Sequence, residues 1–123
     1  MLTMVTKGND LPTVYRSAPA EDDLLPSLAR LSGVPISIRE AQTIGLWLCG
    51  LSAKESSQVL GLSPRTVETY RENIKNKFSI TNKIKFFDLL IRNKLHIPLV
   101  LMGGSYITEY QSNHQDQPLQ ATG

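Results

Sequence analysis

The sequence is poor in the residues that covalent and metal chemistry use most often. Its 123 residues include one cysteine, one tryptophan and two histidines. A single cysteine cannot form an internal disulfide, and it fits a reducing cytoplasm. His96 and His114 stand far from Cys49, and the sequence has no metal-ligand spacing, phosphate-binding glycine loop or nucleophile–base set. We therefore expect no enzymatic activity and no cofactor.

Long hydrophobic runs are also missing. No stretch approaches the roughly 18–20 apolar residues that a membrane-spanning helix needs. The first residues lack the basic region and apolar core of a secretory signal. The hydrophobic content of 41% is enough for the core of one small domain, and it is concentrated between residues 36 and 102. The sequence thus predicts one domain with polar ends and no membrane partner.

Charge is unevenly distributed along the chain. Residues 36–95 contain ten basic and five acidic side chains, whereas the two ends together contain three basic and six acidic ones. The central segment therefore carries a net charge of +5 and the ends −3. A basic centre between acidic ends favours a polyanionic partner, although an ordinary solvated surface gives the same count.

Three serines mark three helix starts. Ser37 and Ser52 are each followed three residues later by a glutamate, which is a capping box, and Ser63 is followed by a proline suited to the first helical position. Gly50 and Gly61 suit the ends of the first two helices. The predicted helices span 38–49, about eight residues after Ser52, 64–78 and 82–95.

The remaining segments give weaker signals. Residues 1–35 read as an N-terminal arm, flexible to about residue 20, in which "EDDLLPSLARLSG" can form a short helix. Residues 96–123 form a C-terminal extension. Its β-rich runs around Gly103 and Gly104 predict either a short β-hairpin over 98–110 or an irregular tail. The expected fold is all-α, with a four-helix domain at 36–95.

The second and third helices have the spacing of a helix-turn-helix, whose second helix can enter a DNA major groove. On a helical projection of residues 64–78, Val67, Ile74 and Phe78 share the buried side. Five residues lie opposite and are the predicted base-reading set: Arg65, Glu68, Thr69, Glu72 and Asn76. The predicted phosphate contacts, at the helix start and on its flanks, are Ser63, Thr66, Tyr70, Arg71, Asn73, Lys75 and Lys77.

The two glutamates on this face allow two interpretations. A glutamate can accept a hydrogen bond from the amino group of cytosine. Alternatively, Glu68 and Glu72 are solvated residues that pair with Arg65, Arg71 and Lys75 at helical spacing.

The fourth predicted helix is apolar nearly all round. Ile84, Phe87, Ile91 and Leu95 recur at helical spacing and are expected to face the core. Phe86, Leu89 and Leu90 lie off that stripe and are the predicted dimer or partner interface.

The segment from Ile36 to Lys83 resembles the DNA-binding domain of the LuxR/FixJ (GerE-type) regulators. The motifs that carry the resemblance are "ISIRE" at 36–40, "GLSAKE" at 50–55, "SPRTV" at 63–67 and "NIKNKF" at 73–78. The chain departs from the family at Tyr70, where a histidine is usual, and at Gln42, a core position. It also departs at Glu68 and Glu72, where relatives often have basic or small residues.

The resemblance implies a bacterial transcriptional regulator whose third helix enters the major groove and whose fourth often joins dimers. The expected partners are double-stranded DNA and a second regulator chain, in a homodimer or heterodimer. An alternative is an interaction module that binds another regulator or RNA polymerase and does not read DNA alone. In the family, a receiver or ligand-binding domain commonly precedes this one.

Overall fold

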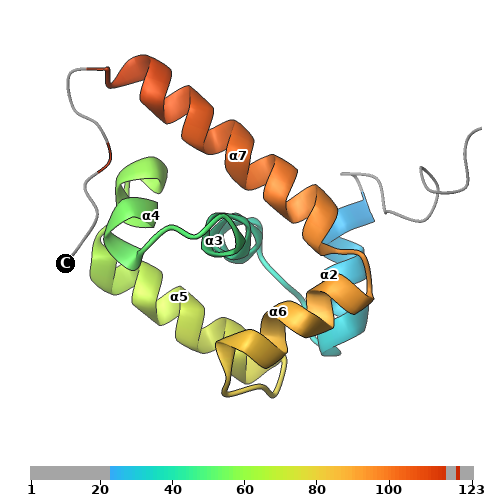
Figure 1. Ribbon diagram of the computed structural model, residues 1–123. Coiled ribbons are helices and arrows are strands. Elements are labelled where there is room, and N and C mark those ends of the chain that lie inside the picture. Colours follow the sequence, from blue (N-terminus) through green and yellow to red (C-terminus); the bar gives the residue numbers. More distant parts are fainter. Residues whose placement is uncertain (1–22, 116–118, 120–123) are drawn as a thin grey trace, which may run out of the picture.

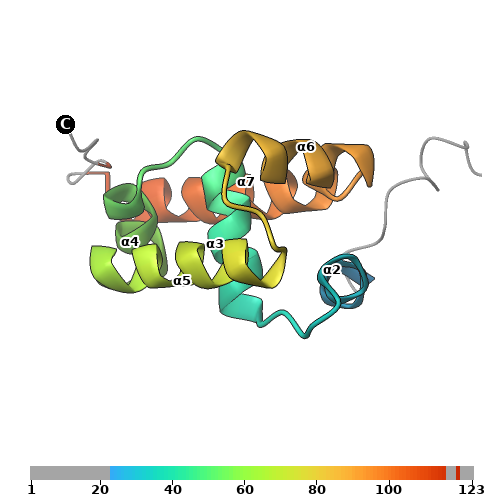
Figure 2. The same cartoon turned by 90° about the horizontal axis from the view of Figure 1, so that it is seen from below.

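The computed structural model describes residues 23–115 and residue 119, and within them all regular structure is helical. The helices are α2 (Leu24–Ser32), α3 (Ile38–Leu48), α4 (Ala53–Leu60), α5 (Pro64–Lys77), α6 (Lys83–Arg92) and α7 (His96–Asn113). Figure 1 looks almost along α3, with the other helices arranged around it. In Figure 2, α3 crosses α5 and α7. None of the described helices is long and apolar enough to span a bilayer.

The three predicted helix starts are confirmed. Ser37 and Ser52 each accept a hydrogen bond from the backbone of the third helical residue, whose glutamate side chain accepts one in return. Ser63 accepts from the backbone N–H of Thr66, and Pro64 occupies the first turn of α5. Gly61 ends α4 in the left-handed region, at φ 70°, which glycine adopts without strain.

The core is built around α3 and the buried side of α5. Val67, Ile74 and Phe78 are buried as the helical projection predicted. Trp47 on α3 lies 5.9 Å from the ring of Phe86, measured between centroids. These rings fill the space between α3, α5 and α6, and so fix the position of the third helix of the predicted domain.

The hairpin predicted over 98–110 is wrong, and so is the irregular tail, because this segment lies within α7. Leu99 and Met102 are buried against α3. The glycines that suggested a turn are helical. A Cβ atom on Gly103 would lie 2.6 Å from the carbonyl oxygen of Gly45, and one on Gly45 would lie 2.6 Å from that of Leu99. The two helix backbones therefore touch directly, a long-range contact that local sequence patterns do not reveal.

The short helix expected in the N-terminal arm is confirmed as α2. Leu24 and Leu28 on this helix belong to the same hydrophobic core as α7. The flexible arm expected to about residue 20 lies outside the described residues. Helices α2 and α7 thus share the core of the predicted 36–95 domain.

The predicted orientation of α6 is wrong in its main part, although Phe87 packs against the core and Leu95, just after the helix, is buried, both as expected. Phe86 and Leu90, expected at a dimer interface, are fully buried, and Leu89 is half-buried against the core. Ile84 and Ile91, expected to face the core, are 73% and 51% exposed. The helix turns this way because Phe86 packs on Trp47 and Phe78, and α7 covers a side that the sequence left without a partner.

An ion pair joins the start of α3 to the end of α5. The Lys77 ammonium lies 2.8 Å from the Glu40 carboxylate, whose side chain is 5% exposed. Lys77 also donates to the carbonyl oxygen of Pro35, and the backbone N–H of Ser37 donates to Glu40. Burial raises the pKa of Glu40, but the hydrogen bonds from Lys77 and Ser37 and the lysine charge outweigh it, so that the pKa is lowered.

The glycine contact between α3 and α7 can be tested with two alanine variants. Gly103→Ala should lower the free energy of unfolding by about 1–3 kcal/mol, because the new methyl group forces the helices apart. Gly104→Ala is the matched control, since a Cβ atom there meets nothing within 4 Å. It should be neutral or stabilise by up to about 1 kcal/mol, the helix preference of alanine over glycine. Equal urea midpoints for both variants would contradict the close contact.

The Glu40–Lys77 pair should make stability depend on pH. Because folding lowers the Glu40 pKa below its ordinary value of 4.5, the stabilisation is present above that pH and is lost as the pH falls through the lowered pKa. Glu40→Gln keeps the capping interaction and removes the charge, and it should cost about 1–2 kcal/mol at neutral pH. Urea titrations should show this cost shrinking in acid. Glu55→Gln, in the other capping box, is the control; a pH-independent difference for Glu40→Gln would refute the assignment.

Candidate nucleic-acid interface

Helices α4 and α5 form a helix-turn-helix with a tight connection. The turn begins at Gly61, and the backbone N–H of Leu62 donates to the carbonyl oxygen of Ser57 at 2.9 Å. The Ser63 cap then fixes the direction in which α5 leaves the turn. One face of α5 is anchored by Val67 and Ile74, so the opposite face points away from the core.

The five predicted base-reading residues all lie on this exposed face of α5. They are Arg65, Glu68, Thr69, Glu72 and Asn76, and each is exposed to solvent. The Thr69 hydroxyl donates its proton to the carbonyl oxygen of Arg65 at 3.1 Å, so this hydrogen bond is made within the helix. Its methyl group and the acceptor lone pairs of its hydroxyl oxygen remain available to a base. The structure brings the set together, and base reading by it stays a prediction.

The start of α5 offers polar groups near the turn. The Ser63 hydroxyl oxygen accepts from the backbone N–H of Thr66 and lies 2.9 Å from the Thr66 hydroxyl. Ser63 is exposed and Thr66 is half-buried. The first turn of α5 thus combines two hydroxyl groups with the positive end of a helix dipole, a combination that suits a phosphate.

Arg71 makes contacts within the protein, and the phosphate contact predicted for it stays a prediction. Its guanidinium lies 4.7 Å from the centre of the Trp47 ring, and Nη2 donates to the carbonyl oxygen of Leu51 at 2.7 Å. Its Nε is buried without a partner among the described residues. Burial lowers the Arg71 pKa, and the negative charge of Glu68 partly offsets this. Arg71 therefore ties α5 to α3 and to the turn before α4.

The two lysines on the flank of α5 are not equally free. The Lys77 ammonium is held by Glu40 and Pro35, and the phosphate contact predicted for it stays a prediction. Lys75 makes a looser ion pair with Glu72, at 3.6 Å, and this pair is on the surface. A surface pair contributes little, so Lys75 can exchange Glu72 for a phosphate at small cost. Asn73 is exposed and Tyr70 is half-buried, and a phosphate contact by either remains a prediction.

Two further cations were given no role from the sequence. Lys83 and Lys85 lie in the first turn of α6 and are exposed. A helix N-terminus carries partial positive charge, so cations there do not stabilise α6. This unfavourable placement could be read from the predicted start of the helix, and it makes the two lysines candidates for anion contacts.

Comparison with known proteins agrees with this geometry. Residues 34–90 match the family profile described as bacterial regulatory proteins, luxR family. The transcriptional regulatory protein MctR of Rhizobium johnstonii is 36% identical over 67 residues, which cover 54% of this chain and 31% of MctR. The transcriptional regulatory protein UhpA is 33% identical over 63 residues in Escherichia coli, and equally so in Salmonella typhimurium; the match covers 51% of this chain and 32% of UhpA.

The chain spans about a third of the length of these curated relatives. No solved structure matches it significantly. The matched segment runs from the turn before α3 to the last part of α6, and it contains the whole helix-turn-helix. Residues 34–90 are therefore a helix-turn-helix domain of the luxR (GerE-type) family of bacterial regulatory proteins.

Proposed function

We propose that this protein regulates transcription in the bacterial cytoplasm by binding double-stranded DNA, with α5 in the major groove. The observation that carries the proposal is the exposed five-residue face of α5, within a domain of the luxR family. The regulatory proteins MctR and UhpA, whose matched segments cover the same domain, support it. The net charge of +5 on residues 36–95 supports a polyanionic partner.

On this proposal, each exposed side chain of α5 has a definite chemical task. Arg65 donates to the O6 and N7 atoms of guanine, and Asn76 can pair with adenine. Glu68 and Glu72 accept from the amino group of cytosine, whereas the methyl group of Thr69 meets that of thymine. Ser63, Thr66, Tyr70, Asn73 and Lys75, with Lys83 and Lys85 of α6, hold phosphates and set the register.

We further propose that the protein forms dimers through the exposed side of α6. Ile84 and Ile91 are two turns apart, and both are more than half exposed. An ion pair between Asp88 and Arg92, at 2.8 Å, lies beside them. Two such faces give a self-complementary contact around a two-fold axis, which would present two α5 helices to successive half-sites. The second chain is a copy of this one or another regulator.

One observation favours a second candidate function, an interaction module that binds another regulator or RNA polymerase. Of the three cations predicted to hold phosphates on α5, Arg71 and Lys77 are bonded to other groups of the protein. The free cationic surface of α5 is thus smaller than the sequence suggested, and two glutamates lie on the same face. DNA binding by the purified protein distinguishes the two candidates.

The DNA-binding proposal predicts different effects for two kinds of α5 variant. Glu68→Ala should change the preferred sequence, because it removes an acceptor from the base-reading face. Lys75→Ala should weaken binding to all duplexes alike and reduce the slope of log affinity against log salt by about 0.9, the loss of one phosphate contact. Binding-site selection from random duplexes, followed by gel shifts at several salt concentrations, measures both effects.

Arg30→Ala, on α2, is the control for the loss of a positive charge outside the helix-turn-helix. If selection enriches no sequence with the unaltered protein, direct DNA reading fails and the interaction module is favoured. If Glu68→Ala keeps the original preference, α5 reads DNA through a different face.

The dimer proposal predicts that a charge on α6 prevents association. Ile91→Lys should shift the protein from dimer to monomer in sedimentation equilibrium, because it places a cation in an apolar contact. Leu101→Lys is the matched control, since Leu101 is also an exposed apolar residue, on α7. A dimer that survives Ile91→Lys and dissociates with Leu101→Lys would move the interface to α7.

A further inference from the structure

Helix α7 presents an uncharged and partly apolar face to solvent. Among its 18 residues, Glu109 is the only aspartate, glutamate, lysine or arginine. Leu99 and Met102 are buried on one side of the helix, so the residues on the opposite side point outward. The solvent side of an ordinary surface helix carries charged residues, and an apolar one suits a protein partner. This outer face consists of Ile97, Val100, Leu101, Gly104, Ser105 and Thr108, and all but Gly104 are exposed.

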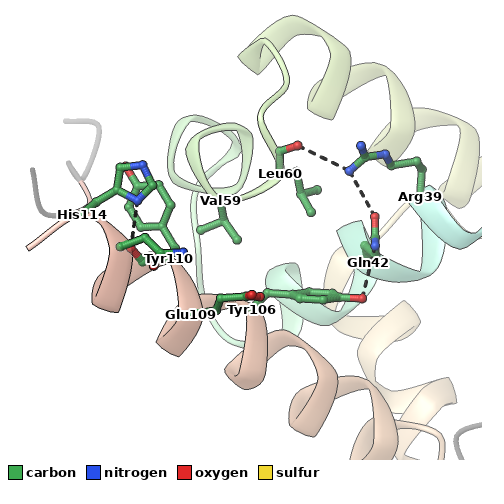
Figure 3. Close-up of a pocket in the computed structure, with 9 residues that line it drawn as sticks. Arg39, Gln42, Val59, Leu60, Tyr106, Glu109, Tyr110 and His114 are labelled. Atoms are coloured by element: carbon green, nitrogen blue, oxygen red, sulfur yellow. Dashed lines mark hydrogen bonds between the residues drawn. The ribbon is translucent and has the colours of Figure 1, made fainter.

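The inner side of α7 is fixed to the domain, so the helix cannot turn to hide its outer face. The backbone of Gly103 lies against that of Gly45. The Gln42 amide donates to the Tyr106 hydroxyl at 3.2 Å, as Figure 3 shows. In Figure 1, α3 and α4 lie along the inner side of α7, and no helix of the described part runs along the opposite side. The outer face is therefore available to a second molecule.

A shallow groove on this face has the form that receives a side chain of another helix. Four of the residues that line it follow at intervals of three, one and three positions, the spacing of the hole that accepts a knob residue in paired helices. They are Leu101, Gly104, Ser105 and Thr108. A Cβ atom on Gly104 would meet nothing within 4 Å, so the hole is open at its centre. Leu101 is 68% exposed and is itself suited to act as a knob.

We propose that this outer face binds the same face of a second copy of this chain, with the two α7 helices antiparallel around a two-fold axis. The centre of the hole lies between positions 104 and 105, about 5 Å along the helix from Leu101. With the axis near positions 102 and 103, Leu101 of each copy enters the hole of the other. A single antiparallel register thus fills both holes, which is the self-complementarity that a two-fold contact requires.

Charges at the two ends of the contact are complementary in the same register. Glu109 lies near one end, and Lys94 directly precedes the start of α7 at the other. Both are exposed, and neither makes an ion pair with a residue that the structure describes. Position 109 comes opposite positions 96 and 97 of the second copy, about 4 Å along the axis from Lys94 and within reach of a lysine side chain. A parallel arrangement would place like charges together, so the charges favour the antiparallel one.

The α7 contact is separate from the surfaces used in the proposed function. Helix α3 lies between α5 and α7 in Figures 1 and 2, so a second copy on α7 leaves the α5 face open. The stretch 97–108 is only about 17 Å long. Such a contact is smaller than the roughly 800 Å² per partner of a standard interface, and its dissociation constant should be on the order of 100 μM. At about 10 μM or below, the dimer proposed for α6 can be tested by itself.

Neighbouring DNA sites raise the local concentration of bound molecules, so dimers formed through α6 would pair through α7 on DNA. That consequence rests on the proposed function. The contact between copies does not, and it is tested without DNA.

Sedimentation equilibrium of the full chain with Ile91→Lys measures the contact, because this change removes the proposed α6 association. Between about 10 and about 500 μM, the mean mass should rise from that of a monomer toward that of a dimer. Adding Leu101→Lys should weaken this association by at least about tenfold, since it places two cations in an apolar contact. Ile38→Lys, at an exposed apolar residue of α3, is the matched control and should have no effect.

A mass that stays monomeric up to about 500 μM, or equal effects of Leu101→Lys and Ile38→Lys, would overturn the proposal. If the α6 proposal alone is wrong, Ile91→Lys changes nothing and the α7 association appears in the unaltered chain as well. If Leu101→Lys lowers the urea midpoint at about 10 μM, the face is covered within one chain, and the contact between copies is refuted.

An exchange of charges tests the antiparallel register. In the same background, Glu109→Lys and Lys94→Glu should each weaken self-association by about fivefold, because like charges then meet at both ends of the contact. The variant with both changes restores two opposite-charge pairs and should recover the affinity of the background. Recovery is the result that a second copy in this register requires. Additive losses in the double variant would rule out the register and the proposal with it.

Discussion

The direct contact of two helix backbones at Gly45 and Gly103 is the constraint on which this structure depends. With no side chain between them, α7 lies close enough to α3 for Leu99 and Met102 to reach the core. That placement covers a side of the domain that the other helices leave open. It also explains why Phe86 and Leu90 can be buried on α6, which leaves Ile84 and Ile91 at the surface.

Two of the cations that the sequence predicted to contact DNA phosphates hold α5, the proposed recognition helix, in place. Arg71 fastens the middle of α5 to Trp47 and to the carbonyl of Leu51, whereas Lys77 fastens its end to Glu40. A helix that must present side chains to base edges has to be positioned precisely, and these contacts supply that precision. These contacts have an electrostatic cost, since two cations are paired within the protein and are less available to DNA. The remaining cationic surface is divided between Lys75 and the start of α6.

The sequence predicted correctly those structural features that depend only on residues close together in the chain. Caps such as Ser37 and Ser63 act within one helical turn, and the buried stripe of α5 follows from its own periodicity, so both were correct. The orientation of α6 and the fold of 98–110 depend on contacts between distant segments, and both were wrong. Gly103 and Gly104 favour a turn by composition alone, and only the backbone of α3, nearly sixty residues earlier, makes a helix the better solution. The exposed α5 face was predictable, whereas the internal engagement of Arg71 and Lys77 was not, because it requires the positions of Leu51 and Glu40.

Gly45 also allows a comparison of this structure with related chains. In a domain without a helix equivalent to α7, the space beside this position is open, and a side chain there would meet no such obstacle. Where a further helix crosses at backbone distance, even a methyl group is too large. The residue at this position therefore indicates whether a related chain can pack such a helix against α3. A related chain with arginine or glutamate at this position could not pack a helix against α3 as closely as α7 does here.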